Sequence, residues 1–526
     1  MDQRGKTREV PQKMTVPIKV GNTSPKFLWG NSGFILGTAN DKTPEAAKDC
    51  FKRNRDLHHE VLKGIEVPAA KAILSFFDRW EPEKTLENEL VTSCAGELLG
   101  KANMVFRFNG KFIHEIPQLA AAWQAHYGET AKERGQCLIT GALDAIPNTH
   151  PLIKGVQGAQ SSGAALVSFN ASAFCSYNKE QNQNAPVGKY AAFAYTAALN
   201  HLLADRKNVH RIGDAAVVCW AENADKQYEE FAADLFFGDG DGDQSDEQRL
   251  SALQASVELL AKGLPCRELD LDPERKFYIL GISPNAARLA VRFFYCDSFG
   301  NIVKNIKAHY DRLEIVRPSY DKYPMLPLWK LLSATVNPSA KDKTPNSAMA
   351  GAVARAVFSG GRYPASLLEC TFLRIRAERE ITRERAAIIK AYYLRNPNEK
   401  CPKEVLTVSL NKDSKNVPYT LGRLFSVYEE IQQAANPGIN TTIKDKYFGS
   451  AATMPATVFP ILSSLAQKHL RKLSDAQRVY LDKKVMTLKS VLGEQYPAHM
   501  SLPEQGSFDL GYYHQTQARY TKKEDK

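Results

Sequence analysis

The chain has 526 residues, of which 43% are hydrophobic and 24% are charged, a composition typical of a globular protein with two or three domains. No apolar run reaches membrane-spanning length, and the N-terminal MDQRGKTREVPQK is too polar for a signal peptide. The nine cysteines form no C-x-x-C pair, which argues against zinc ribbons and disulfide frameworks and favours reduced thiols in the cytoplasm.

The formal net charge is +11, and it is unevenly distributed. Residues 331–526 hold 29 basic and 18 acidic residues, whereas residues 1–330 hold 40 of each. Within the neutral part, residues 221–273 hold 14 acidic and 4 basic residues, so the rest of that part is basic. This pattern favours an acidic partner such as nucleic acid.

The first part of the chain gives mixed secondary-structure signals. A periodic apolar stretch predicts a helix over 191–206, and short runs rich in β-formers predict strands around it. The predicted strands are QCLITG (136–141), AALVSF (164–169), AAVVCWA (215–221), KFYILGIS (276–283) and LAVRFFYC (289–296).

Beyond about residue 325 the strand signals nearly vanish, and helical segments recur between Pro, Gly and Asn breaks. They are SAMAGAVARAVF (347–358), PASLLECTFLRIRAERE (364–380), RERAAIIKAYYLR (383–395), TLGRLFSVYEEIQQAA (420–435) and SDAQRVYLDKKVMTLKSVL (474–492). We therefore expect an α+β protein, with a mixed α/β domain over residues 1–325 and a basic helical bundle over residues 326–526.

An acidic insert, FGDGDGDQSDE (237–247), invites comparison with a calcium-binding loop. With Asp239 in the first position, Gln244 stands where the loop needs glycine and Leu250 where it needs the bidentate glutamate. We predict a solvated, flexible loop instead.

The stretch GVQGAQSSGAALVSF (155–169) holds a polar, glycine-rich turn ahead of an apolar run. A P-loop is excluded because Ala164 and Ala165 replace the phosphate-binding lysine and the Mg²⁺-binding hydroxyl. The glycine spacing also excludes a dinucleotide fingerprint and a serine-hydrolase elbow. Two interpretations stay open: a structural turn, or a non-catalytic loop that touches a polyanion or base edges.

Support for catalysis is thin, since the chain has no H-E-x-x-H motif and no other spacing typical of a metal or cofactor site. One alternative is a serine hydrolase in which His150, with Asp144 behind it, serves Ser161 or Ser162 as a base. Proximity in sequence is not the geometry that such a triad needs, so we expect no catalytic residues, metal or cofactor.

Several long motifs carry a resemblance to a known family. They are PKFLWGNSGFILG (25–37), HPLIKGVQGAQSSGAALVSFNASAF (150–174), NAPVGKYAAFAYTAALNHLL (184–203), FYILGISPNAARLAVRFFYCDSFG (277–300), LGRLFSV (421–427), DKYFGSA (445–451) and LGYYHQTQ (510–517). The chain resembles the large subunit of type I-C CRISPR surveillance complexes, the Csd-type Cascade large-subunit family. Family members usually begin with a further segment before the first motif, which here follows only 24 residues.

The resemblance implies a non-catalytic subunit near the 5′ end of the guide RNA in a Cascade complex with backbone, guide-RNA-end and small subunits. It also implies that the subunit engages the protospacer-adjacent motif in double-stranded DNA, helps to form the R-loop and supports recruitment of the helicase-nuclease. The helical C-terminal part would resemble the small subunits that hold the displaced strand, and a separate small subunit would arise from the same reading frame. A purely structural ribonucleoprotein scaffold is the alternative that stays open.

On this basis we predict that a glycine-spaced loop contacts the motif-bearing duplex. Its residues are Lys154, Gln157, Gly158, Gln160, Ser161 and Ser162, with Asn170 after the predicted strand as a further candidate. Glutamine amides pair with base edges, serine hydroxyls bind bases or phosphates, and lysine neutralises a phosphate. The competing interpretation is a polar turn that satisfies its own backbone.

Two other segments are candidate DNA contacts. In FLWGNSG (27–33) we favour Asn31 and the preceding Lys26 as contacts, and core packing for Trp29.

The other segment is FLRIRAEREITRERAAIIKAYYLR (372–395). As one continuous helix it would place Arg376, Arg379, Arg383 and Lys390 in a sector of roughly 60°, a stripe that could follow phosphates. An N-cap at Thr382 would split this stripe, and pairing with Glu378, Glu380 and Glu384 would make it an ordinary charged surface.

Overall fold

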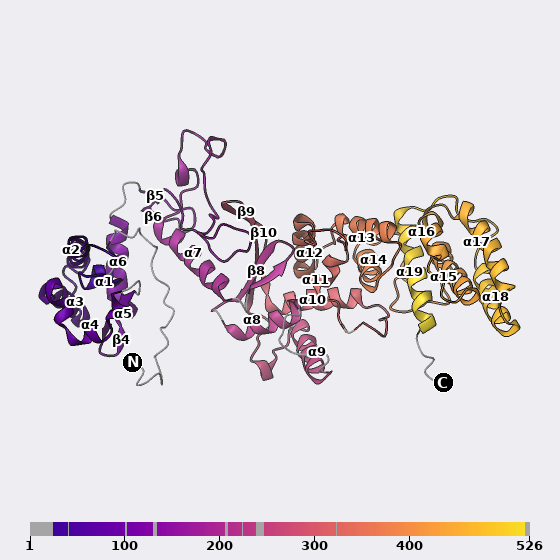
Figure 1. Cartoon of the computed structure of the whole chain (residues 1–526), viewed down its shortest axis with the longest axis horizontal. Helices are drawn as coiled ribbons and strands as arrows, with labels where there is room; N and C mark the ends of the chain where they lie inside the picture. The colour runs from indigo at the N-terminus through magenta and orange to yellow at the C-terminus, as the bar shows by residue number, and fades with distance from the viewer. Residues whose placement is uncertain are drawn as a thin grey trace. The chain divides into compact units, whose positions relative to one another are not determined.

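The computed structural model describes residues 25–39, 41–99, 103–129, 134–205, 209–223, 225–237, 247–321 and 323–520 (Figure 1). The chain forms two compact units, one of Met1–Gly155 with Gln160–His201 and one of Val156–Ala159 with Leu202–Lys526. The flexible loop predicted over 237–247 lies almost wholly outside the described residues, because residues 238–246 are not among them.

The first unit begins with short helices and two-stranded sheets. Its elements are β1 (Trp29–Gly30), α1 (Ser32–Ile35), α2 (Pro44–Val61), α3 (Pro68–Arg79), α4 (Glu89–Ser93), α5 (Ala95–Leu98), β2 (Met104–Val105), β3 (Arg107–Phe108), β4 (Lys111–Phe112) and α6 (Pro117–Glu129). Antiparallel pairs join β1 with β2 and β3 with β4. Helix α2 begins at the cap residue Thr43, and Pro44 fixes its first turn. Phe51 of α2 packs in one core with Ile73 and Phe77 of α3.

The rest of the first unit contains a hairpin of β5 (Arg134–Gln136) and β6 (Leu143–Ala145), and most of α7 (Lys189–Ala204). The helix predicted over 191–206 is thus confirmed. The strand predicted over 136–141 is wrong, because residues 138–140 form a turn. Leu138 and Ile139 are 68% and 61% exposed there, so this apolar run is not buried as a strand would be.

The second unit contains a four-stranded antiparallel sheet in which neighbours in sequence are neighbours in space. The order is β10 (Arg288–Ser298), β9 (Lys276–Asn285), β8 (Ala215–Ala221) and β7 (Val209–Ile212). The three strands predicted over 215–221, 276–283 and 289–296 are therefore confirmed. One face of the sheet contributes Val217, Ile279 and Phe293 to the main hydrophobic core.

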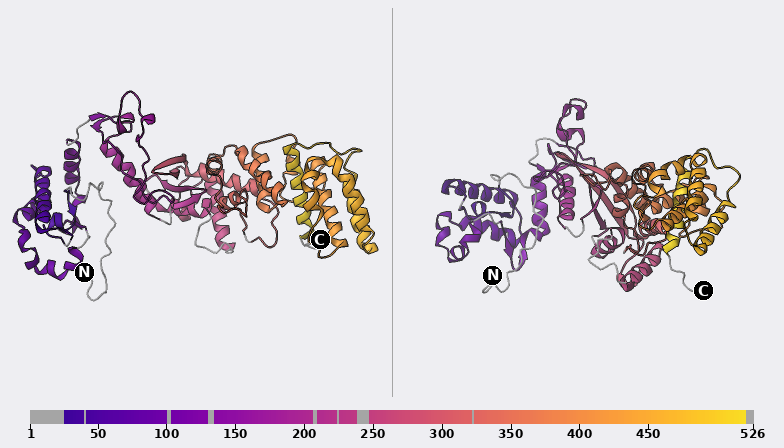
Figure 2. Two further views of the ribbon diagram at one scale, coloured as in Figure 1. Left: turned by 45° about the horizontal axis from the view of Figure 1, so that its top comes forward. Right: turned by 45° about the vertical axis from the view of Figure 1, so that its right-hand side comes forward.

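Helices make up the rest of the second unit. They are α8 (Lys226–Ala232), α9 (Glu247–Ala261), α10 (Phe299–Leu313), α11 (Leu328–Ser333), α12 (Ser347–Ser359), α13 (Ala365–Glu378), α14 (Arg383–Arg395), α15 (Val417–Ala435), α16 (Ile443–Thr453), α17 (Pro455–Leu470), α18 (Asp475–Lys489) and α19 (Leu502–Tyr520). The views of Figure 2 show the last of these, in yellow, packed side by side. The five helices predicted beyond residue 325 are confirmed.

The closest helix pair, α15 and α19, is built around two glycines. A Cβ atom on Gly422 would lie 1.9 Å from the Phe508 carbonyl oxygen, and one on Gly511 would lie 2.1 Å from the Tyr419 carbonyl oxygen. Only glycine permits such an approach of two backbones. Both glycines belong to motifs that carry the family resemblance, LGRLFSV and LGYYHQTQ.

The α+β class is confirmed, with small antiparallel sheets before residue 299 and helices after it. The change expected near residue 325 falls inside the second unit, where one hydrophobic core continues from Ile212 to Tyr513. Within the described part of the chain, no helix is both long and apolar enough to cross a membrane.

Candidate nucleic-acid interface

The loop over 154–163 is closed at its base by an antiparallel bridge between Ile153 and Ala164. Each backbone nitrogen donates to the other residue's carbonyl oxygen, at 2.9 Å from Ile153 and 2.8 Å from Ala164. Both residues are fully buried. The loop therefore projects from a fixed point.

Asn200 of α7 also fixes the backbone where the loop begins. Its Oδ1 accepts from the Lys154 backbone nitrogen at 2.7 Å, and its Nδ2 donates to the Leu152 carbonyl oxygen at 3.1 Å. The side-chain amide thus does what a neighbouring strand would do for residues 152–154. We did not predict this contact, because 46 residues separate Asn200 from Lys154.

The loop glycines serve the turn and its packing. Gly155, Gly158 and Gly163 have φ values of +88°, +84° and +108°, which other residues rarely adopt. A Cβ on Gly163 would lie 2.9 Å from the Leu152 Cβ, and one on Gly158 would lie 3.2 Å from the Pro284 Cγ. The close approach at Gly158, a predicted DNA contact, is thus to the protein's own strand β9.

The polar side chains of the loop face solvent. Lys154, Gln160, Ser161 and Ser162 are exposed, and no described residue hydrogen-bonds to the side chains of the last three. Gln157 is also exposed, and its Oε1 accepts from Arg211 Nη1 of β7 at 2.9 Å. These side chains are accessible to a ligand.

Asn170 is exposed, but no strand positions it. The strand predicted over 164–169 is wrong: residues 164 and 165 make bridges only, and the chain then bends. Residues 165–169 are only half-buried, and no described strand pairs with residues 166–169.

The FLWGNSG segment is packed into the first unit. Trp29 is 8% exposed, as core packing requires, and the Lys26 ammonium lies 4.4 Å from the centre of its ring. Asn54 of α2 fixes the segment, since its Oδ1 accepts from the Lys26 backbone nitrogen and its Nδ2 donates to the Phe34 carbonyl oxygen, both at 3.1 Å. Asn31 precedes α1 and is half-buried. This environment favours a structural role for Lys26 and Asn31.

The arginine-rich run is two helices and not one, so the predicted continuous stripe is wrong. The helix α13 ends at Glu378, Arg379 adopts a left-handed conformation with φ +55°, and Thr382 caps α14 by accepting from the Arg385 nitrogen. Arg379 is exposed, as is Arg376, whose Nη2 donates to Gln505 Oε1 at 2.8 Å. Glu378 pairs with Arg374 on the same helix and with Arg385 of α14.

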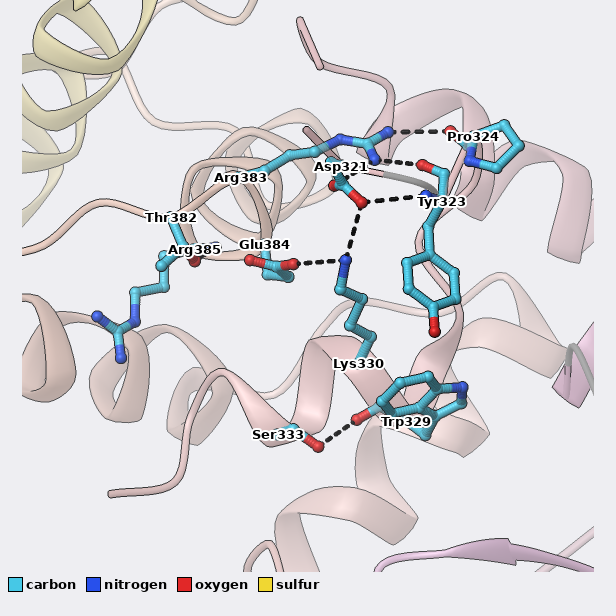
Figure 3. Close-up of polar contacts among 10 residues, drawn as sticks. All are labelled: Asp321, Tyr323, Pro324, Trp329, Lys330, Ser333, Thr382, Arg383, Glu384 and Arg385. Carbon is cyan, nitrogen blue, oxygen red and sulfur yellow. Dashed lines mark hydrogen bonds and ion pairs between the residues drawn. The ribbon is translucent and has the colours of Figure 1, made fainter. Parts of the chain in front are cut away.

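The other two members of the stripe are buried. Arg383 Nη1 lies 2.9 Å from Asp321 Oδ2 and also donates to the Tyr323 carbonyl oxygen, while Nη2 donates to the Pro324 carbonyl oxygen (Figure 3). Lys330 of α11 lies 3.1 Å from both Asp321 and Glu384 and completes a four-residue ion network (Figure 3). This network fixes the segment before α11 against the start of α14.

Lys390 is 3% exposed, and its Nζ donates to the Arg312 carbonyl oxygen at 3.1 Å. Burial lowers the pKa of this lysine. The burial of Arg383 and Lys390 therefore favours a structural role for both, whereas Arg376 and Arg379 stay candidate contacts.

The hypothetical serine-hydrolase arrangement is not assembled. His150 is 5% exposed, with Nδ1 2.5 Å from the Tyr195 hydroxyl and Nε2 2.8 Å from Asn182 Oδ1. Both ring nitrogens are thus engaged by residues other than Ser161, Ser162 and Asp144. Among the described residues, no three His, Cys, Asp or Glu side chains are grouped to hold a metal ion.

The comparison with protein families decides which group the chain belongs to. The family model for CRISPR-associated protein (Cas_Csd1) matches residues 1–520. The chain belongs to the Csd1 family. The resemblance to a Csd-type Cascade large subunit is thereby confirmed. No curated protein matches the chain.

Membership of the Csd1 family makes the chain a CRISPR-associated protein that takes part in a Cas complex. The segment 150–174, which is one of the family motifs, contains the 154–163 loop. Among the predicted sites, this segment has the most exposed polar side chains. In this Csd1-family chain, sequence reasoning missed Arg211, which contacts Gln157 and is 54 residues away from it. The basic run Arg206–Arg211 was the only signal for it.

Proposed function

We propose that the chain is the non-catalytic large subunit of a type I-C RNA-guided surveillance complex, and that its loop 154–163 engages the protospacer-adjacent motif in double-stranded DNA. In this role it supports R-loop formation and recruitment of the helicase-nuclease. Its partners are the guide RNA, the backbone, guide-RNA-end and small subunits, the target duplex and the displaced strand.

The observation that carries this proposal is the geometry of the loop. Its base is held by the Ile153–Ala164 bridge and by Asn200, while its glutamine and serine side chains are exposed. A structural turn would be expected to use those side chains to satisfy its own backbone. Here Gln160, Ser161 and Ser162 make no such hydrogen bond to any described residue, which favours a role in binding.

The side chains have the chemistry for reading a duplex. A glutamine amide forms two hydrogen bonds with an adenine edge in the major groove, and serine binds bases or phosphates. The Lys154 ammonium is exposed and would neutralise a phosphate, which positions the protein without reading sequence. Recognition of a short motif needs only a few such contacts.

The non-catalytic part of the proposal is supported by the environment of His150. A general base needs a free ring nitrogen within reach of its nucleophile. Because both nitrogens of His150 are occupied by Tyr195 and Asn182, neither loop serine has this histidine as a base.

The test is the change Gln160→Ala in an assembled complex, with binding measured on duplexes that contain or lack the motif. We expect a loss of about 1–3 kcal/mol, or roughly 5- to 150-fold, on the motif-bearing duplex, since one bidentate base contact is removed. Binding to the motif-less duplex should stay the same. Gln118→Ala is the matched control, because Gln118 is exposed on α6 outside the loop.

Two results would contradict the proposal. An equal loss on both duplexes would assign Gln160 to sequence-independent contacts. No loss in a folded, assembled complex, together with a flat salt dependence of binding, would favour the structural scaffold.

A further inference from the structure

The second unit contains a pocket that no predicted site includes. Its volume is about 310 Å³, and its lining residues are Arg211, Ile212, Phe236, Phe237, Leu328 and Trp329. A space of this size is at the lower end of small-ligand sites, which span roughly 300–1,000 Å³. It is too small for a helix or an extended peptide, and its walls are mostly aromatic and aliphatic.

The floor of the pocket is rigid. Phe236 and Phe237 lie in a π-helical turn, Ala233–Phe237, directly after α8, and both are nearly fully buried. The ring of His210 stacks on Phe237 with centroids 3.9 Å apart and planes 4° apart. These contacts hold the Phe237 ring in one orientation.

The wall formed by Trp329 is exposed but well positioned. Trp329 is 45% exposed, and Tyr323 meets it edge-on with centroids 6.0 Å apart. The next residue, Lys330, is held by Asp321 and Glu384 in the ion network that also contains Arg383 (Figure 3). The buried charges of this network thus fix α11 and, with it, a large aromatic side chain that faces solvent.

The rim of the pocket is basic. Arg211 is exposed and is held at two points, by its Nε bond to the Gly213 carbonyl oxygen at 2.8 Å and by its Nη1 bond to Gln157. Asp342 lies near it: its pKa is lowered first by hydrogen bonds from Thr344 and further by the charge of Arg211. Lys341 and Lys343, the sequence neighbours of Asp342, are both exposed.

We propose that this pocket takes one unstacked nucleotide of the target DNA, with its base against Trp329 and its phosphate beside Arg211. The inference rests on the proposed function and adds a site to it. Aromatic walls with an arginine at the rim suit a base and a phosphate. Every base offers a π-face for stacking, and a guanidinium group can form bidentate hydrogen bonds with a phosphate. Gln157, the part of the motif-engaging loop that belongs to the second unit, bonds directly to the pocket arginine, so this part of the loop and the pocket are adjacent.

This placement gives the pocket a function in opening the duplex. The first base pair beside the motif must lose its stacking before guide pairing can begin. Stacking on one aromatic side chain shifts such an equilibrium about 5- to 150-fold. A pocket beside the motif loop would trap the first unstacked nucleotide and leave its partner strand to the guide RNA.

The experiment uses the assembled complex and target duplexes with 2-aminopurine at single positions beside the motif, in each strand. We expect one position whose fluorescence changes on binding in the wild type and with Trp329→Phe, but not with Trp329→Ala. The rate of R-loop formation should fall about 5- to 150-fold with Trp329→Ala. Tyr480→Ala is the matched control, since Tyr480 is 58% exposed on α18, away from the pocket-lining residues.

Each outcome decides the matter. If Trp329→Ala gives the wild-type fluorescence at every position and the wild-type rate, no nucleotide enters the pocket. If that variant folds but does not assemble with the other subunits, while Trp329→Phe does, Trp329 serves a protein contact and the inference is overturned. If the wild-type complex does not distinguish motif-bearing from motif-less duplexes, the proposed function itself fails, whatever the variant does.

Discussion

His58 shows how much of the first unit depends on one uncharged ring. Its Nδ1 donates to the Asn54 carbonyl oxygen at 2.7 Å, and its Nε2 accepts from the Leu28 backbone nitrogen at 3.0 Å. Phe27 and Phe77 pack against the ring, with centroids 5.3 Å and 4.6 Å away. Burial lowers the pKa of His58 to about 4, because the core cannot solvate a charged imidazole.

This pKa predicts a loss of stability in mild acid. The unfolded chain takes up the proton near pH 6.5, whereas the folded chain takes it up near pH 4, so the stabilisation is complete above pH 6.5 and is lost as the pH falls toward 4. The free energy of unfolding should decrease by at most about 3 kcal/mol over this window. Urea unfolding at several pH values between about pH 7 and about pH 4 measures it.

His58→Gln provides the comparison for this prediction. The variant should be less stable than the wild type at neutral pH, but its stability should depend less on pH. His309 and His514 also have pKa values lowered by burial, so only the difference between wild type and variant reports on His58. An identical pH dependence in both proteins would contradict the assignment.

At the same scale, the exposure of a charged residue was the hardest property to predict. The glycine, serine and glutamine content of the 154–163 loop predicted a polar turn and left open whether its side chains are exposed, as the structure shows them to be. The burial of Arg383 did not, because it depends on Asp321, 62 residues earlier in the chain. Asn200 and Arg211 were missed for the same reason: their partners are distant in sequence.

Among the elements, helices with local start signals were predicted well. The helices α12, α14 and α15 begin at side-chain caps on Asn346, Thr382 and Asn416, which are visible in the sequence. The two false strands, 136–141 and 164–169, are apolar runs without a partner strand. A run of β-formers predicts a strand only where the fold supplies a neighbour, and the sequence alone does not show that neighbour.

The crossing of α15 and α19 leads to a prediction about two glycines. Gly511→Ala would place a methyl group 2.1 Å from the Tyr419 carbonyl oxygen, and backbone on both sides leaves no room for relaxation. We expect a loss of about 3 kcal/mol or more in the free energy of unfolding. Thermal or urea unfolding followed by far-ultraviolet circular dichroism measures it.

Gly449→Ala is the matched control for this change. Gly449 lies within α16, and a Cβ atom there would have no heavy atom within 4 Å. Alanine should therefore stabilise the helix by about 0.5–1 kcal/mol. If both substitutions have the same effect, close packing is not the reason for glycine at position 511.

At the scale of the whole molecule, the structure narrows down which basic residues form the charged surface, because Arg383 and Lys390 are buried. The excess of basic residues after position 330 must then be carried by other side chains, among them the exposed Lys468 and Arg471 at the end of α17. Under the proposed function we expect Lys468→Gln with Arg471→Gln to lower the log–log salt slope of target binding by up to about 2. Motif preference should stay unchanged.

The control for this double change is Lys52→Gln with Lys63→Gln, which removes the same charge from exposed sites of the first unit. Salt titrations on duplex targets and on targets with a displaced strand would compare the two variants. Equal salt slopes in the two double variants would mean that binding depends on the total charge of the protein and not on basic residues of the helical C-terminal part. A larger decrease in salt slope for the control than for the Lys468→Gln, Arg471→Gln variant would contradict the expected binding of the displaced strand to the helical C-terminal part.

The division of the 154–163 loop between two units has a consequence for the order in which the protein is made. Residues 156–159 belong with the second unit, where Gln157 bonds to Arg211 and Gly158 packs on Pro284. When the ribosome has added His201, every residue of the first unit has been synthesised, including Ile153, Ala164 and Asn200 at the start and end of the loop. Residues 156–159 must wait until β7 and β9 have emerged. Under the proposed function, a nascent or prematurely terminated chain would therefore carry the loop without its recognition geometry and would not compete for target DNA.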